Sequence, residues 1–357
     1  MKAQNAKLDF TGQHIFVGLD VGKKSWKICI MTREFEHRTF SQPPQSEVLV
    51  SYLKRNFPGA QYHCVYEAGY CGFWIQHQLR QHGIECIVVN PADVPTTHKE
   101  SNSKSDRVDA HKLVRHLRNS ELTPIYTPSR TAQENRSLLR MRNCFVRKQT
   151  RCKNQIKSLL HYYGVSLPQG ISERYWSKRY IQWIESIQLE HSSGQQALKS
   201  LVIELIQLRE NIVRITGNIR SLAATEPYRD LVAYLVSVPG ISLLSAMILL
   251  TELIDINRFK GIDHLVNFVG LAPGQHSSST VERTTGLSVR CNASLRFIII
   301  ECAWIAIRKD PALMMAFQNL CARMPKNRAI IRIARKLLSR IYHVWKHQQF
   351  YQLGLVA

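Results

Sequence analysis

The sequence is short of acidic residues. Its 357 residues include 26 Asp and Glu against 48 Lys and Arg, a formal net charge of +22, and no acid follows Pro311. This excess exceeds what solubility requires and indicates a polyanionic partner, DNA or RNA, whose phosphates basic side chains neutralise with release of counterions. An anionic membrane surface is the alternative, and it is disfavoured because the charge is spread along the whole chain.

Other features are missing as well. The nine cysteines include no Cys-x-x-Cys pair, which argues against a zinc ribbon or a disulfide-stapled secreted fold. No apolar run reaches the length of a membrane span, and the first residues contain no hydrophobic signal core. We therefore expect a cytoplasmic protein with no membrane segment.

One acidic stretch stands out in this basic chain. Asp106 and Asp109 are three residues apart, and the apolar residues that follow recur at helical spacing, so both carboxylates should project from one face near the start of a helix. Two acids on one face repel each other unless a cation lies between them, and a divalent metal would serve. An ordinary acidic first turn, which the helix dipole favours, is the other interpretation.

The residues before this stretch alternate between strand and helix patterns. Apolar segments typical of strands occupy residues 15–20, 26–31, 63–66 and 85–89; helical periodicity covers 47–57 and 72–82, and a proline-containing loop is expected at 40–45. This order predicts an α/β sheet with parallel members, in which ligands gather at the carboxyl ends of strands. Asp20 and Glu67 both end such strands. With Asp106 and Asp109 they form four acids that can converge on one metal site suited to phosphodiester chemistry.

Four short blocks here resemble a known family. They are Gly-Leu-Asp-Val-Gly-Lys at 18–23, Tyr-Glu-Ala-Gly at 66–69, Val-Asn-Pro at 89–91 and Lys-Ser-Asp-Arg-Val-Asp-Ala at 104–110. In order and spacing they look like the Asp-Glu-Asp-Asp blocks of the IS110 transposases, relatives of the Piv DNA invertases. The resemblance implies an RNase H-like first domain similar to the RuvC Holliday-junction resolvase.

The middle of the chain is basic and helical. A helix over residues 131–163 carries Arg136, Arg140, Arg147 and Arg151, with no acid after Glu134, and is predicted to bind nucleic-acid phosphates. Apolar residues then alternate at spacings of three and four from Leu198 to Leu222. This heptad pattern predicts a coiled coil that either folds back on the basic helix or joins two protomers.

The last part combines a tight turn, a serine run and more arginines. Val-Pro-Gly-Ile at 238–241 indicates either a helix-hairpin-helix element or a plain turn between helices. A serine-rich loop at 277–279 precedes two arginines, and there a serine hydroxyl could act as a nucleophile towards phosphate. Further arginines lie on one face of the last helix. The predicted phosphate-binding residues of this part are Arg283, Arg290, Arg332, Arg335 and Arg340.

This serine-rich block resembles the C-terminal block of the same transposases, Gly-Leu-x-Pro followed by His-Ser-Ser-Gly. Matching residue by residue places the family's catalytic serine at Ser278. The chain has Ser279 where the family has glycine, which leaves Ser277 and Ser279 as alternative nucleophiles.

The resemblance implies a DNA recombinase that moves its own insertion element. Asp20, Glu67, Asp106 and Asp109 would hold Mg²⁺ or Mn²⁺, and Ser278 would form a transient serine-phosphate link to DNA. The implied partners are donor and target double-stranded DNA, a non-coding bridge RNA and further copies of the chain, as a dimer or tetramer, in the bacterial cytosol at the nucleoid. The expected domains are a RuvC-like domain (1–125), a basic helix with a coiled coil (126–225) and a mainly α transposase domain (226–357).

Three other functions fit parts of the sequence. A metal-dependent nuclease of the junction-resolvase type would use the acids without a serine nucleophile. An actin-like ATPase would need a second Asp-x-Gly phosphate loop and a glycine-rich adenosine site, and the sequence has neither. A non-catalytic RNA-binding protein would not depend on Asp20 and Glu67.

Overall fold

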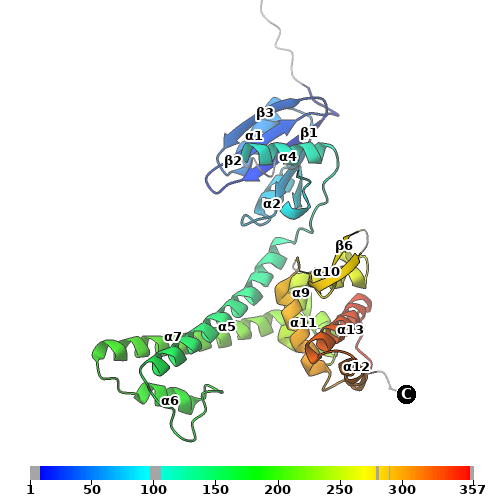
Figure 1. Ribbon diagram of the computed structural model, residues 1–357. Helices are drawn as coiled ribbons and strands as arrows, with labels where there is room; N and C mark the ends of the chain where they lie inside the picture. Colours follow the sequence, from blue (N-terminus) through cyan, green and yellow to red (C-terminus); the bar gives the residue numbers. More distant parts are fainter. Residues whose placement is uncertain (1–8, 97–105, 279–280, 289, 354–357) are drawn as a thin grey trace, which may run out of the picture. The chain divides into compact units, whose positions relative to one another are not determined.

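The chain divides after Ser129 into two units, Met1–Ser129 and Arg130–Ala357, whose elements are labelled in Figure 1. The computed structural model describes residues 9–96, 106–278, 281–288 and 290–353; of residues 106, 107, 274–278 and 281–285 it describes the backbone alone. The division falls close to the first domain boundary expected from the sequence, at residue 125. The further boundary at residue 225 stays a prediction.

The first unit is built on one mixed sheet with the strand order β3-β2-β1-β4-β5. The first three strands form antiparallel hairpins, whereas β4 and β5 run parallel to β1. The mixed α/β sheet is consistent with the predicted RNase H-like domain. The helical remainder of the chain is consistent with the predicted mainly α C-terminal part. The strands are β1 (His14–Val21), β2 (Trp26–Met31), β3 (Glu36–Gln42), β4 (Gln61–Glu67) and β5 (Glu85–Val89).

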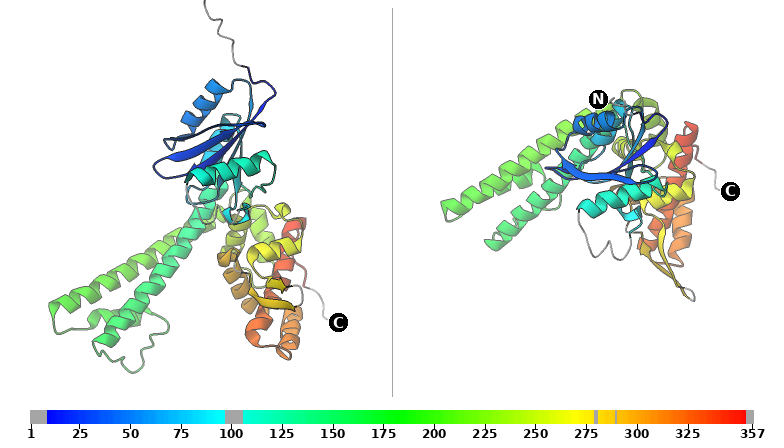
Figure 2. Two further views of the ribbon diagram at one scale, coloured as in Figure 1. Left: turned by 45° about the horizontal axis from the view of Figure 1, so that its top comes forward. Right: turned by 90° about the horizontal axis from the view of Figure 1, so that it is seen from above.

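Helices cover both faces of this sheet (Figure 2). Helices α1 (Ser46–Asn56) and α2 (Trp74–Gln81) pack on one face, where the alternate β1 residues Ile15, Val17 and Leu19 are buried with them. Helix α4 (Asp106–Arg118) packs on the other face through Ala110 and Val114. A short 3-10 helix, η1 (Pro91–Asp93), follows β5.

One expectation for this unit was wrong. Residues 40–45 were expected to form a loop, but β3 extends to Gln42 and pairs with β2. This edge strand is polar and largely exposed, so it lacks the apolar alternation by which strands are found in sequences. The residues that follow α4 form a connecting segment, in which Pro124 forms a bridge with Val89 and the amide of Ile125 donates to the carbonyl of Val88 at 2.8 Å.

Gly18 sets how closely α4 approaches the sheet. A Cβ atom at this position would lie 2.2 Å from the carbonyl oxygen of Ala110 and 2.7 Å from the amide nitrogen of Val114. Real Cβ atoms do not tolerate such distances, so only glycine lets the helix backbone rest directly on β1. The glycine of the Gly-Leu-Asp block therefore has a packing role.

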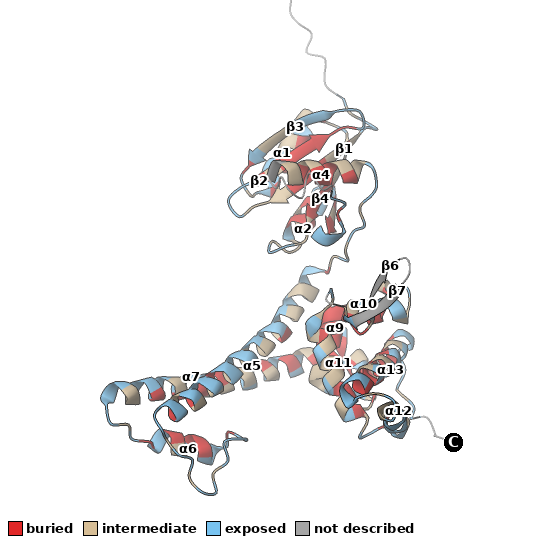
Figure 3. Cartoon of the chain, viewed as in Figure 1, coloured by how far each residue is buried: buried red, intermediate tan, exposed pale blue. Residues whose placement is uncertain are grey.

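The second unit begins with two long helices, α5 (Arg130–Tyr162) and α7 (Ser192–Ala223), which pack antiparallel. Their buried residues line the seam between them and their other faces are exposed (Figure 3). Short α6 (Lys178–Ser186) closes the far end of this pair. Within this chain the heptad residues thus fold back on the basic helix, one of the two predicted arrangements, while a true coiled-coil geometry stays a prediction.

The rest of the unit is mainly helical, as expected, around a separate apolar core. None of the helices in the described part of the chain combines the length and apolar character that a membrane span requires. The elements are α8 (Tyr228–Val236), α9 (Leu243–Leu253), η2 (Ile256–Arg258), α10 (Ile262–Val269), β6 (Pro273–Ser278), β7 (Val281–Leu287), α11 (Ala293–Ala306), α12 (Pro311–Cys321) and α13 (Lys326–His347).

The turn between α8 and α9 packs against α11. Gly240 has a φ of +92°, and a Cβ there would lie 2.5 Å from the carbonyl oxygen of Cys302. Val238 and Ile241 on either side are buried. The turn glycine is thus required by packing inside the domain, and a phosphate-binding role of a helix-hairpin-helix element stays a prediction.

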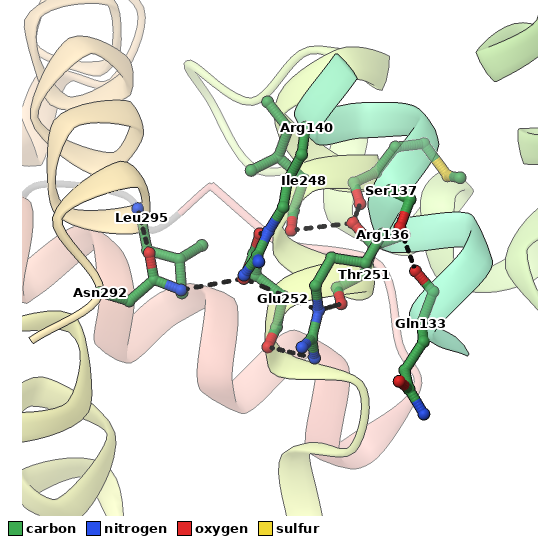
Figure 4. Close-up of polar contacts among 10 residues, drawn as sticks. Gln133, Arg136, Ser137, Arg140, Ile248, Thr251, Glu252, Asn292 and Leu295 are labelled. Carbon is green, nitrogen blue, oxygen red and sulfur yellow. Dashed lines mark hydrogen bonds and ion pairs between the residues drawn. The ribbon is translucent and has the colours of Figure 1, made fainter. Parts of the chain in front are cut away.

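Buried Glu252, near the end of α9, joins three segments of the unit (Figure 4). Its two carboxylate oxygens accept hydrogen bonds from Nε and Nη2 of Arg140 at 2.7 and 2.9 Å, and Oε2 also accepts from Asn292 at 3.0 Å. Asn292 in turn caps α11 at the amide of Leu295. Burial alone would raise the pKa of Glu252, but the hydrogen bonds and charges of Arg140 and the charge of Arg136 outweigh it and hold the pKa below its ordinary value.

Replacing this carboxylate should loosen α5 from the domain. Glu252→Gln leaves the two arginines without their counter-charge and should lower the free energy of unfolding by about 1–3 kcal/mol at neutral pH. Because the folded-state pKa of Glu252 lies below its ordinary 4.5, the stabilisation is complete above pH 4.5 and is lost as the pH falls through the folded-state pKa. Denaturant unfolding at several pH values measures this, with exposed Glu301→Gln on α11 as the control. Equal stability of the two variants at pH 7 would contradict the interpretation.

Candidate active site

Two of the predicted acids end neighbouring parallel strands. The pairing of Leu19 in β1 with Tyr66 in β4 brings the next residues, Asp20 and Glu67, level with each other at the carboxyl edge of the sheet. Neighbouring strands lie about 4.8 Å apart. Side chains alternate along a strand, so both acids point to the face that α4 covers, opposite buried Leu19 and Tyr66.

Helix α4 adds a third acid to the same place. Asp20, Glu67 and Asp109 line one small cavity of about 150 Å³, together with Leu113 of α4. Asp109 precedes Ala110, the residue whose carbonyl rests on Gly18, so the close helix–strand contact is what brings this carboxylate to the strand ends. Three of the four predicted acids are thus brought together. Asp106 is the first residue of α4, and its side chain lies outside the described part.

A buried lysine lies between two of these acids. The Nζ atom of Lys112 is 3.5 Å from Oδ1 of Asp109 and 3.7 Å from Oε1 of Glu67, and its side chain is 9% exposed. An ammonium group at this position offsets the repulsion between the two carboxylates. Sequence reasoning missed Lys112, although its spacing of three from Asp109 places the two residues on the same helix face.

The donor set fits a hard divalent cation. Carboxylate oxygens are the ligands that Mg²⁺ and Mn²⁺ prefer, and three of them line this cavity. Among the side chains that the structure describes, no group of three or more His, Cys, Asp or Glu is already arranged as a metal site. The ammonium of Lys112 lies close to Glu67 and Asp109 and would compete with a metal for these two carboxylates.

Tyr70 is a second residue that sequence reasoning missed. It follows the Tyr-Glu-Ala-Gly block and lines the cavity. Its hydroxyl donates to the carbonyl of Val21 at 2.8 Å, and the ammonium of Lys23 lies 5.5 Å from its ring centroid. Tyr70 therefore ties the loop after β4 to the end of β1. The sequence signal that could have identified Tyr70 was its position three residues after Glu67.

Ser277 and Ser278 lie in the second unit, in a strand. Residues 277–279 were expected to form a loop, but β6 extends to Ser278, whose backbone pairs with Val281 of β7. Cross-strand pairing overrides the low strand propensity of serine and glycine here. Ser278 is thus the last residue of β6, at the tip of a hairpin. The side chains of Ser277, Ser278 and Arg283 and the whole of Ser279 lie outside the described part.

The predicted phosphate-binding arginines fall into two groups. Arg147, Arg151, Arg290 and Arg332 are exposed, and Arg335 is partly exposed. The other three make ion pairs within the unit: Arg136 and Arg140 contact Glu252, although the side chain of Arg140 is 60% exposed, and Arg340 contacts Asp310. Arg340 is also 5.3 Å from the ring centroid of Tyr351. These three residues have structural contacts that their sequence spacing did not reveal; their binding to nucleic acid stays a prediction.

Comparisons with known proteins find matches in both units of the chain. A family model described as a transposase of the DEDD and IS110 type matches residues 17–164, and one described as the transposase IS116/IS110/IS902 family matches residues 232–318. The putative transposase y4qE of Sinorhizobium fredii is 29% identical over 295 residues, covering 81% of this chain and 71% of that protein. The transposase for insertion sequence element IS1111A of Coxiella burnetii is 27% identical over 276 residues, 76% of this chain and 74% of that protein.

Adding one methyl group at Gly18 should displace α4. Gly18→Ala forces the helix backbone away from β1, which should cost about 1–3 kcal/mol in the free energy of unfolding and separate Asp109 from Asp20. Stabilisation of the protein by MgCl₂ should then be lost, as thermal unfolding with and without the salt would show. Gly217→Ala, which adds the same methyl group into open space within α7, is the control. A normal MgCl₂ response in Gly18→Ala would refute the geometry.

Removing the ammonium of Lys112 should make metal binding tighter. A charge pair at about 4 Å is worth about 4 kcal/mol at an effective dielectric constant of about 20, so loss of this competing cation should lower the MgCl₂ midpoint at least about tenfold. Lys112→Met should also be less stable than wild type without metal, since its acids are unpaired. A titration of unfolding temperature against MgCl₂ measures both effects. Exposed Lys54→Met on α1 is the control, and an unchanged midpoint in Lys112→Met would rule out competition.

Proposed function

We propose that the chain, which belongs to the IS110 family of transposases, is the recombinase that cuts and rejoins DNA to move its insertion element. The observation that carries the proposal is the meeting of Asp20, Glu67 and Asp109 at one cavity, within a chain whose two family matches span both units. A basic protein with an acidic cavity suits phosphodiester chemistry, because the surface attracts the polyanion and the acids can hold a metal.

The nucleophile in this proposal is the hydroxyl of Ser278. Its oxygen attacks the scissile phosphorus, a serine-phosphate ester forms, and the leaving sugar oxygen takes up a proton. Attack on this ester by a hydroxyl of the other DNA strand reverses the step, joins the strands and frees the serine. One phosphate ester replaces another at each stage, so no ATP is needed. The position of Ser278 at the tip of a hairpin supports the proposal, because a residue there can reach a bulky duplex.

The acids have a separate role. Asp20, Glu67 and Asp109, with Asp106 at the start of the same helix, would hold Mg²⁺ or Mn²⁺. When bound, the ion would polarise the scissile phosphate and stabilise the charge of the transition state. Gly18 and the pairing of β1 with β4 keep the carboxylates level with each other, and Lys112 balances their charge before the metal binds.

The partners follow from the same proposal. Donor and target double-stranded DNA would lie on the exposed arginines of α5 and α13, and a non-coding bridge RNA would select both sites by base pairing. The chain would act as a dimer or tetramer, so that the acids of one copy can serve the serine of the same or of another copy. It would work in the bacterial cytosol, associated with the nucleoid.

A covalent trapping experiment tests the proposal. Wild-type protein is incubated with MgCl₂, the element's DNA ends and its RNA, then denatured; a DNA-linked protein band is expected. Ser278→Ala should bind DNA normally and form no adduct, whereas Ser277→Ala should still form it. Asp109→Asn, or EDTA added to wild type, should reduce the adduct at least about a hundredfold.

Each contrary outcome has a clear meaning. Cleavage without any adduct would point to the metal-dependent nuclease that attacks with water. A normal adduct in Ser278→Ala would move the nucleophile to a neighbouring serine, and wild-type activity in EDTA would remove the metal.

A further inference from the structure

A cavity in the second unit combines an apolar floor with a cationic rim. It has a volume of about 790 Å³ and lies between the root of the β6–β7 hairpin and one face of α13. Leu271, Leu287 and Ile331 contribute apolar surface. The rim consists of four basic side chains of α13: Arg328, Arg332, Arg335 and Lys336.

The four cations have no counter-charge in the described part of the chain. No ion pair or side-chain hydrogen bond joins them to another described residue, and no lining residue is acidic. Like charges on neighbouring turns of a helix destabilise it. Helix α13 tolerates them because its other face, including Ile333, Leu337 and Ile341, is completely buried.

Arg340, two turns beyond Arg332 on α13, provides a contrast. Its guanidinium contacts buried Asp310 and lies over the ring of Tyr351, so it serves the packing of α12 and the chain end. The four rim cations lack such contacts within the described residues. Their arrangement around an open cavity therefore suits an external anion.

The cavity lies at a defined distance from Ser278. Pro273, which lines it, pairs with Leu287 at the root of the hairpin, and Ser278 pairs with Val281 at the tip. Five residues of antiparallel strand span about 17 Å. One strand of B-form DNA rises about 3.4 Å and turns about 35° per nucleotide, so two phosphates about 17 Å apart in a straight line are about three nucleotides apart.

We propose that this cavity holds a backbone phosphate of the DNA strand that Ser278 attacks, about three nucleotides from the scissile phosphate. The inference rests on the proposed function for the identity of the strand. The rim cations bind the phosphate oxygens, and the apolar floor receives the adjoining sugar. Such an anchor would fix the register of the strand along the hairpin, because phosphate contacts position a duplex without reading its bases.

Equilibrium binding tests the anchor without any chemistry. In a Ser278→Ala background, duplex DNA of the element's end is titrated at several salt concentrations. Adding Arg332→Gln and Arg335→Gln should reduce the slope of log K against log[salt] by about one, because the slope is about 0.9 per neutralised phosphate and the cavity holds one phosphate. Arg323→Gln is the control, because Arg323 is exposed in the same unit and lies outside the cavity. This variant leaves Arg328 to Lys336 intact and should reduce the slope by less than half as much as the double variant does.

Neutral methylphosphonate linkages then locate the phosphate. One placed about three nucleotides from the cleaved position should weaken binding roughly threefold to tenfold, and should have no further effect in the arginine double variant. The cleaved position is mapped with wild-type protein on the same DNA.

The outcomes separate this anchor from the serine chemistry. An unchanged salt slope, a sensitive phosphate at another spacing, or an effect confined to an RNA probe of the element's non-coding segment would overturn the anchor. If wild type instead cleaves without a covalent adduct, the serine proposal fails, while the binding slope and the phosphate spacing still decide the anchor.

Discussion

The direct contact between the backbones of α4 and β1 is the constraint on which the acidic site depends. Because Gly18 has no side chain, the helix rests on the strand at the carbonyl of Ala110, and the preceding Asp109 reaches the edge where Asp20 and Glu67 end their strands. The sheet supplies two carboxylates through strand register, and the helix supplies the third through close packing. A larger separation would move Asp109 away from the two carboxylates of the sheet.

Much of the first unit could be predicted from the sequence because most of its strands are apolar and largely buried. The limits of β2 and β5 were predicted correctly, and the acids could be assigned to strand ends because alternation and turn residues mark where strands stop. Strand β3 was missed since an exposed edge strand carries no apolar pattern. Lys112 was missed for another reason: only the packing of α4 on the sheet shows that its ammonium lies between Glu67 and Asp109.

In the second unit the sequence predicted helices better than it predicted the roles of their charges. The heptad residues of α7 and the basic helix α5 were both recognised, since helical periodicity is a local property. Whether an arginine pairs internally is not local: Glu252 is 112 residues from Arg140, and Asp310 is 30 from Arg340. The strand at Ser278 likewise depends on pairing with β7, which the propensity of a serine run does not predict.

The helical pair α5–α7 has a core of its own near α6, distinct from the core formed mainly by helices α8 to α13. Whole turns could therefore be added to or removed from both helices together without repacking the residues around Glu252 or the hairpin. Relatives could differ in the length of this projection while their catalytic residues stay unchanged. The length over which this helical pair extends could then vary, in evolution or by design, without any change in the catalytic residues.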